Sequence, residues 1–136
     1  DTILPHLDFV SIGTNDLTQY TMAADRLSPQ LAYLTDPWQP AVLRLIQHTC
    51  VVGRDNNVPV GVCGEAAADP MLACVLTGLG VTSLSAASTA VAGVGAQLAE
   101  LTLEQCQKMA EAAINAESPA DARSAVIALL EEYQTA

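Results

Sequence analysis

Two polar clusters, each preceded by an apolar run, contain the side chains best suited to chemistry. Asn15 and Asp16 follow the apolar residues 7–12 and Gly13, and Cys63 follows a second apolar run that ends at Val62. Backbone N–H groups at a helix start can hold a phosphate, and a carboxylate can bind Mg²⁺. The same two residues could instead only cap a helix, because Asn and Asp are strongly preferred at that position. Both interpretations remain open at this point.

Cys63 differs from the other three cysteines in its surroundings. Cys50, Cys74 and Cys106 lie in apolar stripes at helical spacing, which predicts small core side chains. Cys63 stands where a strand gives way to a loop, so its thiol could face a cleft and act in catalysis. The sequence has no Cys-x-x-Cys spacing, and all four cysteines are expected to be reduced thiols rather than disulfide or zinc ligands.

The remaining polar candidates point less clearly to a function. Arg26 lies in a polar loop after the first cluster. A lone arginine there is usually a solvated charge, and it becomes a clamp only beside a bound phosphate. We expect structural roles for Glu65 and for the two histidines, His6 and His48, which lie away from the predicted strand ends.

An alternation of strand and helix patterns is expected to position these residues. Short apolar runs predict strands at residues 7–12, 58–62 and 81–85. Apolar spacing and capping residues predict helices at residues 41–53, at residues 70–79 and from about residue 90. Two further helices are expected to follow Thr102 and Ser118.

This alternation predicts an α/β fold with a parallel sheet and right-handed crossovers. In such folds the ligand lies at the carboxyl ends of the strands, where both polar clusters fall. Three strand–helix units are too few to close an eight-stranded barrel, whose usual size is about 250 residues. The chain therefore forms either a small open sheet or the end of a larger domain.

Composition and charge exclude several classes of protein. The 136 residues are 51% hydrophobic, which suffices for the core of about one domain, and carry 15 acidic against 5 basic residues, a net charge of −10. This charge argues against binding nucleic acid or anionic membranes. No apolar stretch approaches the roughly 20 residues of a membrane span, and the first residues show no secretion pattern. We expect a cytoplasmic protein.

One stretch of the chain is specific enough to suggest a family. Residues 11–20 (SIGTNDLTQY) resemble the signature of the phosphoenolpyruvate-utilising enzymes. Residues 21–26 (TMAADR) and 62–65 (VCGE) follow in that family's order and spacing. Residues 32–37 (AYLTDP) and 40–46 (PAVLRLI) resemble the branch of enzyme I of the bacterial sugar phosphotransferase system most closely. The resemblance extends from about residue 7 to the final helix.

The resemblance implies a (β/α)8 TIM barrel, of which residues 1–136 would form the last three β/α units and the C-terminal helices. It implies that Asn15 contacts phosphoenolpyruvate, that Asp16 binds Mg²⁺ and that Arg26 holds the phosphate. It also implies that Cys63 protonates the enolpyruvate carbon. The phosphoryl group would pass to a histidine of a separate N-terminal domain and then to the phosphocarrier protein. The family further implies a homodimer.

The chain would lack the family's second magnesium carboxylate, its other phosphate-binding arginines and its acceptor histidine. We therefore expect an incomplete barrel with little or no activity alone and with a tendency to self-associate. Two alternatives remain open. The chain could belong to phosphoenolpyruvate synthase or pyruvate phosphate dikinase, which share the Asn-Asp turn and the cysteine, or it could be a non-catalytic dimerisation module.

Overall fold

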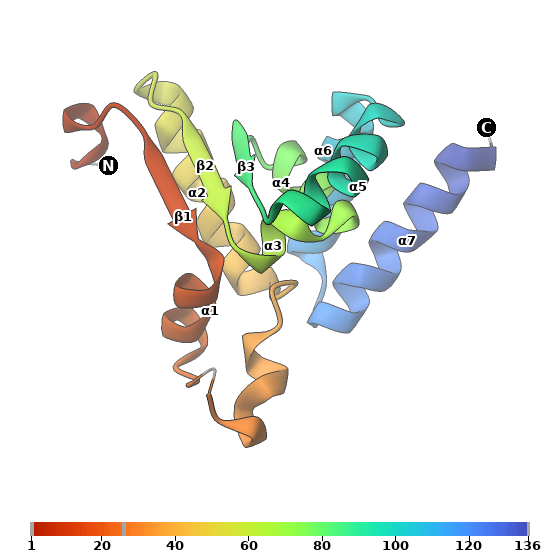
Figure 1. Ribbon diagram of the computed structural model, residues 1–136, viewed down its shortest axis with the longest axis horizontal. Helices are drawn as coiled ribbons and strands as arrows, with labels where there is room; N and C mark the ends of the chain where they lie inside the picture. The colour runs from red at the N-terminus through yellow and green to blue at the C-terminus, as the bar shows by residue number, and fades with distance from the viewer. Residues whose placement is uncertain (1, 26, 136) are drawn as a thin grey trace.

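The chain folds around a small parallel sheet, seen here in a computed structural model that describes residues 2–25 and 27–135. In this part of the chain the strand order is β1 (Val10–Gly13), β2 (Val60–Cys63) and β3 (Ser83–Ser85). Each strand pairs in parallel with the next one along the chain (Figure 1). The parallel α/β arrangement predicted from the alternating pattern is confirmed.

The strands are shorter than the apolar runs that predicted them. Leu7 and Phe9 lie before β1 and are 42% and 67% exposed. The ladder starts where the Val10 N–H donates to the carbonyl of Pro59, at 2.9 Å. Pro59 has no N–H to donate to the ladder, and β2 begins at the next residue, Val60. The prediction of a strand over residues 7–9 is therefore wrong.

Helices make up most of the rest of the chain. In chain order, the helices are η1 (Leu4–His6), α1 (Thr14–Met22), η2 (Pro29–Thr35), α2 (Pro40–Asp55), α3 (Glu65–Ala68), α4 (Pro70–Gly78), α5 (Ser88–Ala99), α6 (Leu103–Asn115) and α7 (Pro119–Thr135). The predicted caps are confirmed: Asp69 accepts from the N–H groups at the start of α4, and Thr102 forms a capping box with Gln105. Neither α3 nor the 3-10 helix η2 was predicted.

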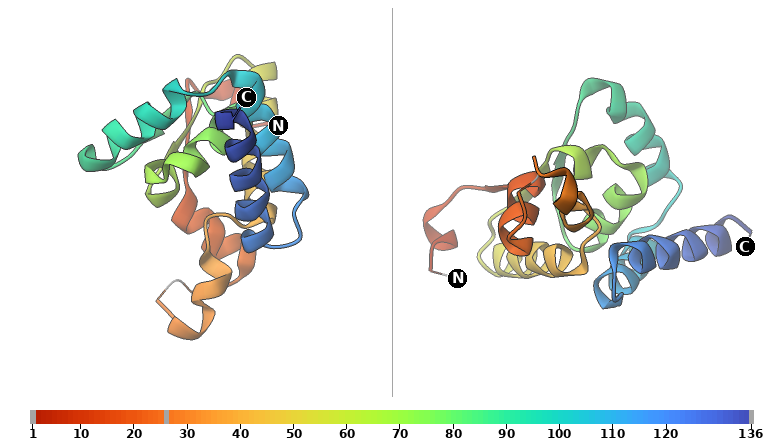
Figure 2. Two further views of the ribbon diagram at one scale, coloured as in Figure 1. Left: turned by 90° about the vertical axis from the view of Figure 1, so that its right-hand side faces the viewer. Right: turned by 90° about the horizontal axis from the view of Figure 1, so that it is seen from below.

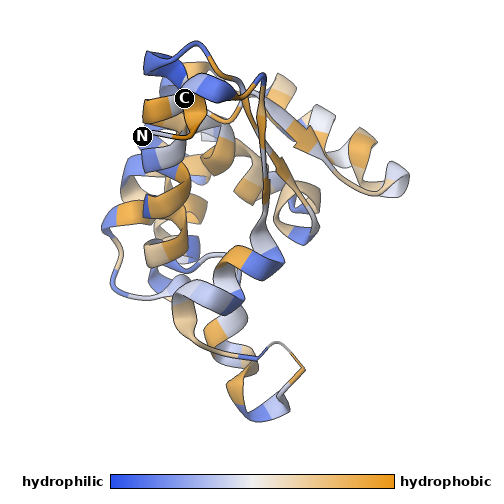
Figure 3. Ribbon diagram, turned by 90° about the vertical axis from the view of Figure 1, so that its left-hand side faces the viewer, coloured by the Kyte–Doolittle hydropathy of each residue, from blue (hydrophilic) through white to orange (hydrophobic). Residues whose placement is uncertain are grey.

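The hydrophobic core lies between the sheet and helices α2, α4 and α6. Figure 3 shows that hydrophobic residues predominate along the strands, whereas α1 and the segment after it are more polar. Helix α6 packs against α4, α2 and α7, and α6 and α7 form an adjacent pair at one side of the molecule (Figure 2). The largest fully buried side chains include Trp38, Leu43, Ile46, Leu72, Leu76 and Met109. Within the described residues no helix combines the length and apolarity that crossing a membrane requires.

The three cysteines predicted to lie in the core are buried. Burial raises the pKa of Cys50 to about 11 and that of Cys74 to about 12, and it also raises the pKa of Cys106. The cause is the same for each thiol, because a thiolate would lose its hydration in the core. Cys63 is the exception, with a partly exposed side chain.

These buried thiols predict a loss of stability at alkaline pH. The folded-state pKa of Cys50 lies above the value of about 8.5 in an unfolded chain, so its contribution is complete below that pH and is lost as the pH rises towards 11. Melting temperatures measured between pH 7.5 and 11 are expected to fall less steeply for Cys50→Ala than for the parent. Tyr and Lys titrate in both proteins, so the difference reports Cys50. Parallel curves would refute this assignment.

Candidate functional site

The carboxyl ends of β1 and β2 bring the two predicted polar clusters together. Gly13, the last residue of β1, lies opposite Cys63, the last residue of β2. Helix α1 starts directly after Gly13, and its buried first residue, Thr14, donates a hydrogen bond from Oγ1 to the carbonyl of Cys63 at 3.4 Å. In the view from below in Figure 2, α1, α3 and η2 lie at this end of the sheet.

Gly64 makes the sharp turn from β2 into α3 possible. Its φ of +104° lies in the left-handed region, which favours glycine. A Cβ on this residue would lie 3.5 Å from Oγ1 of Thr14 and 3.9 Å from Nδ2 of Asn15. The backbone after Cys63 therefore passes directly beside the first turn of α1.

Asn15 lines a polar cavity of about 330 Å³ at this edge, together with Leu27, Thr35 and Glu65. The placement puts the predicted ligand Asn15 beside Glu65, for which we expected only a structural role. Leu27 and Thr35 were not predicted as site residues, because they come from a segment whose fold has no periodic signal. Its prolines and the polar residues around them were the only hint of a functional loop.

Asp16 is exposed in the first turn of α1, close to the end of β1. Its Oδ2 lies 3.9 Å from the place where a Cβ on Gly13 would stand. The N-cap of α1 is Gly13, which makes no side-chain capping bond. The alternative that Asn15 and Asp16 serve as N-cap residues is therefore wrong, although the helix dipole still favours a carboxylate in this first turn.

The single carboxylate of Asp16 is compatible with a magnesium ion that is shared with a substrate. Among residues 2–25 and 27–135, no group of three His, Cys, Asp or Glu side chains could hold a metal ion. Mg²⁺ is usually bound through one or two carboxylates together with water and substrate phosphates, not by an all-protein cage. Asp16 is one exposed carboxylate, next in sequence to Asn15 of the polar cavity, and it fits that mode of binding.

The thiol of Cys63 is half-buried and faces strand β1. It donates a hydrogen bond to the carbonyl of Ile12, with an S···O distance of 3.6 Å. The Cys63 side chain thus contacts β1, the strand that leads into α1, and it directly precedes the turn at Gly64.

Arg26, the predicted phosphate ligand, lies outside the described residues. Its neighbour Leu27 lines the polar cavity. The backbone N–H of Leu27 donates to Oδ1 of Asp25 at 2.8 Å.

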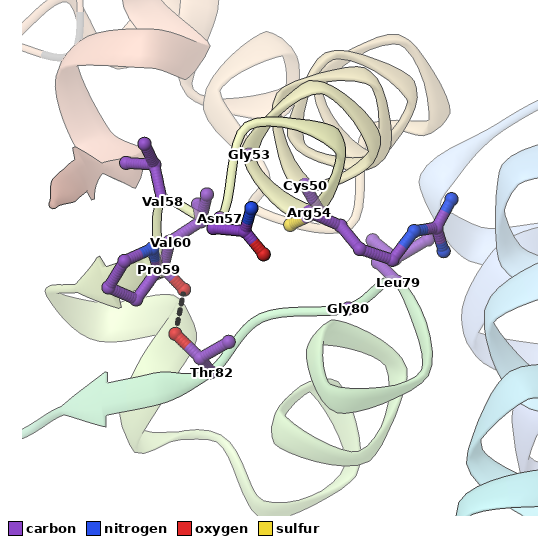
Figure 4. A pocket seen from close by; sticks show the side chains of 10 residues that line it. All are labelled: Cys50, Gly53, Arg54, Asn57, Val58, Pro59, Val60, Leu79, Gly80 and Thr82. Carbon is purple, nitrogen blue, oxygen red and sulfur yellow. Dashed lines mark hydrogen bonds between the residues drawn. The ribbon is translucent and has the colours of Figure 1, made fainter. Parts of the chain in front are cut away.

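A second cavity, of about 420 Å³, lies at the opposite end of the sheet (Figure 4). It is bounded by the C-terminal end of α2, the start of β2 and the loop before β3, and most of its lining is apolar. In Figure 4 the hydroxyl of Thr82 donates to the carbonyl of Val60, at 3.0 Å. Parallel α/β proteins bind ligands at the carboxyl ends of their strands, so the polar cavity is the candidate site.

Comparison with known proteins gives a consistent picture. Residues 1–103 match the family model described as "PEP-utilising enzyme, PEP-binding domain". A phosphoenolpyruvate-protein phosphotransferase of Streptomyces coelicolor is 51% identical over 129 residues, which are 95% of this chain and 23% of that protein. One of Bacillus sp. strain S is 42% identical over 115 residues, 85% of this chain and 20% of the relative. A multiphosphoryl transfer protein of Xanthomonas campestris is 44% identical over 124 residues, 91% of this chain and 15% of the relative. The chain thus spans about a fifth of the length of the two phosphotransferases.

Proposed function

Since the chain belongs to the PEP-utilising enzymes and matches their PEP-binding domain, we propose that it supplies part of the phosphoenolpyruvate site of a phosphoenolpyruvate-protein phosphotransferase. The observation that carries this proposal is the meeting of two clusters at one sheet edge. Asn15 and Asp16 open α1 at the end of β1, and Cys63 ends the neighbouring strand. The names of the relatives support the phosphotransferase branch over the synthase and dikinase branches.

The fold proposed for the functional protein is a (β/α)8 barrel, with residues 1–136 as its last three β/α units and C-terminal helices. The repeating unit of such a barrel is a parallel strand followed by a helix. This chain contains three such units in sequential order. The polar cavity then lies at the carboxyl face, where barrel enzymes bind their substrates.

Within this site we assign binding roles to three residues. The Asn15 amide contacts phosphoenolpyruvate from the cavity wall. Asp16 would hold Mg²⁺, and Arg26 holds the phosphate. When bound, Mg²⁺ would neutralise charge on the phosphate oxygens and on the enol oxygen. With a net charge of −10 on the chain, the substrate's negative charge has to be balanced locally by such groups.

Cys63 is the proposed acid. As the phosphoryl group moves to a histidine nitrogen, an N–P bond forms and the bond from phosphorus to the enolpyruvate oxygen breaks. The enolate of pyruvate that remains takes a proton at its terminal carbon from the Cys63 thiol, which gives pyruvate and a thiolate. Water then reprotonates the thiolate. The half-buried S–H at the strand end supports this role.

The acceptor histidine and the phosphocarrier protein belong to the same proposal, because the relatives are named for phosphoryl transfer to protein. We also propose that the functional protein is a cytoplasmic homodimer. Exposed apolar side chains such as Phe9 and Val91, which are 67% and 59% exposed, offer surface for burial in an assembly.

A chimera tests the function directly. In it, this chain replaces the matching segment of the Streptomyces coelicolor relative, and pyruvate release from phosphoenolpyruvate is followed with the acceptor proteins present. Turnover near that of the unaltered relative supports the proposal. A folded chimera that neither binds phosphoenolpyruvate nor releases pyruvate overturns it.

Replacing Cys63 by alanine in this chimera is expected to lower pyruvate release by about 100-fold, because the loss of a general acid typically costs 10²–10⁴ in rate. Binding of phosphoenolpyruvate should change little, since the thiol makes its hydrogen bond to Ile12. Cys50→Ala is the matched control, because Cys50 lies in the core. Equal turnover of the two variants would remove Cys63 from the mechanism.

A further inference from the structure

A cluster outside the proposed catalytic groups links the C-terminal helix to the segment that walls the polar cavity. Its members are Asp36, Trp38, Asp69 and Arg123, which come from three separate parts of the chain. Asp36 follows η2, Asp69 caps α4, and Arg123 belongs to the first turns of α7. We call the pair Asp36 and Arg123, with Trp38 beneath it, the clamp.

Trp38 anchors this cluster in the body of the protein. Its ring is fully buried, and its Nε1 donates to Oδ2 of Asp69 at 3.1 Å. The other carboxylate oxygen of Asp69 accepts from the backbone N–H groups of Met71 and Leu72, at 3.0 and 3.2 Å. Trp38 is therefore held by a carboxylate that is itself fixed by the start of α4.

Arg123 closes the cluster from the side of α7. Its Nη2 lies 3.3 Å from Oδ1 and 3.5 Å from Oδ2 of Asp36, and its guanidinium carbon lies 5.2 Å from the centroid of the Trp38 ring. Oδ1 of Asp36 also accepts a hydrogen bond from the backbone N–H of Trp38, at 2.9 Å. Arg123 thus makes both an ion pair and a cation–π contact to a desolvated ring. Together these two interactions are expected to stabilise its position more than a fully exposed ion pair would.

The clamp fixes the end of the segment that reaches the cavity. Thr35, a lining residue of the cavity, directly precedes Asp36. Gln39, which is 8% exposed, donates from Nε2 towards the carbonyls of Tyr33 and Leu34, at 3.4 and 3.3 Å. The position of η2, and with it the wall formed by Leu27 and Thr35, therefore depends on residues 36–39. Figure 1 shows this segment projecting beyond the sheet, where η2 packs against α1.

We propose that Arg123 and Asp36 are positioning residues for the phosphoenolpyruvate site: they clamp the segment of residues 27–35 in place as a wall of the polar cavity. This inference rests on the proposed function of that cavity. Arg123 is far from the cavity in sequence and carries no motif. Its role follows from the contacts of α7 with the segment between α1 and α2.

The test uses Arg123→Leu, which removes the ion pair and the cation–π contact while keeping an aliphatic side chain. Hydrogen exchange of peptides that cover residues 27–39 is measured on the chain, and KM and kcat for phosphoenolpyruvate are measured in the chimera. We expect faster exchange in that segment and a KM raised about tenfold, with kcat within about twofold of the parent value. Arg123→Lys, which keeps the charge, should recover part of the effect.

Arg54→Leu is the matched control, because Arg54 is an exposed arginine whose partner is the neighbouring Asp55. Fluorescence of Trp38, the only tryptophan of the chain, reports the clamp itself and should change in the Arg123 variant only. Equal exchange of residues 27–39 in the two variants overturns the proposal, as does faster exchange with an unchanged KM. If the chimera without substitutions fails to turn over phosphoenolpyruvate, the proposed function is wrong. The exchange data then still decide whether the clamp holds residues 27–35 in place.

Discussion

Replacing Gly78 by alanine is expected to destabilise the fold by about 3 kcal/mol or more, which is the upper range for forced overpacking of a core. Gly78 ends α4 where that helix meets α6. A Cβ on this residue would overlap the backbone carbonyl of Cys106 and lie 2.8 Å from the backbone N of Gln107. Because backbone atoms cannot rotate away as a side chain can, α4 and α6 would have to separate.

Thermal or denaturant unfolding measures this effect, and a fall in melting temperature of about 10 °C is expected. Gly95→Ala is the matched control. Gly95 lies within α5, and a Cβ there would meet nothing within 4 Å. That variant should be stabilised by about 0.5–1 kcal/mol, because alanine is the better helix former. Similar melting temperatures for the two variants would show that α4 and α6 do not pack as closely as the structure indicates.

Replacing Asp16 by asparagine is expected to lower kcat/KM for phosphoenolpyruvate in the chimera by about 100-fold or more, as the loss of one charge-stabilising group usually does. Asparagine keeps the size of the side chain and removes the negative charge that would hold Mg²⁺. The fold should lose only about 0.3–1 kcal/mol, the value of one carboxylate near a helix N-terminus. A large kinetic loss without a large loss of stability is thus expected.

The measurement is steady-state pyruvate release as a function of Mg²⁺ concentration. For Asp16→Asn, saturation should require much more Mg²⁺ than for the parent. Asp8→Asn is the control, since Asp8 is an exposed acid that precedes β1 and lies outside the site. Unchanged Mg²⁺ dependence in Asp16→Asn would exclude this carboxylate as a metal ligand.

The local elements could be read from the sequence because each leaves a local signal. Asp69 before Pro70 and Thr102 before Gln105 mark helix starts through bonds to residues two or three positions away. The strand ends at Gly13 and Cys63 could be placed to within about a residue for the same reason. Where the β1 pairing begins could not be predicted, because it depends on Pro59, which directly precedes β2.

The parts of the site that escaped prediction depend on contacts between distant elements. The cavity wall at Leu27 and Thr35 has no helical or strand period, and the contact between Arg123 and Asp36 joins residues 87 positions apart. The sequence motif did place Asn15, Asp16 and Cys63 at strand ends, and the register between Gly13 and Cys63 brings them to one edge. Their chemical roles stay predictions, because shape alone does not define a reaction.

Nuclear magnetic resonance with Mn²⁺ in place of Mg²⁺ tests the central claim most directly. In the chimera and in the presence of phosphoenolpyruvate, the paramagnetic ion should broaden the amide signals of residues 14–17 and 63–65, at the carboxyl ends of β1 and β2. It should leave those of residues 53–60, beside the cavity of Figure 4, unaffected. Broadening centred on residues 53–60, or none that depends on phosphoenolpyruvate, would contradict the assignment of the site.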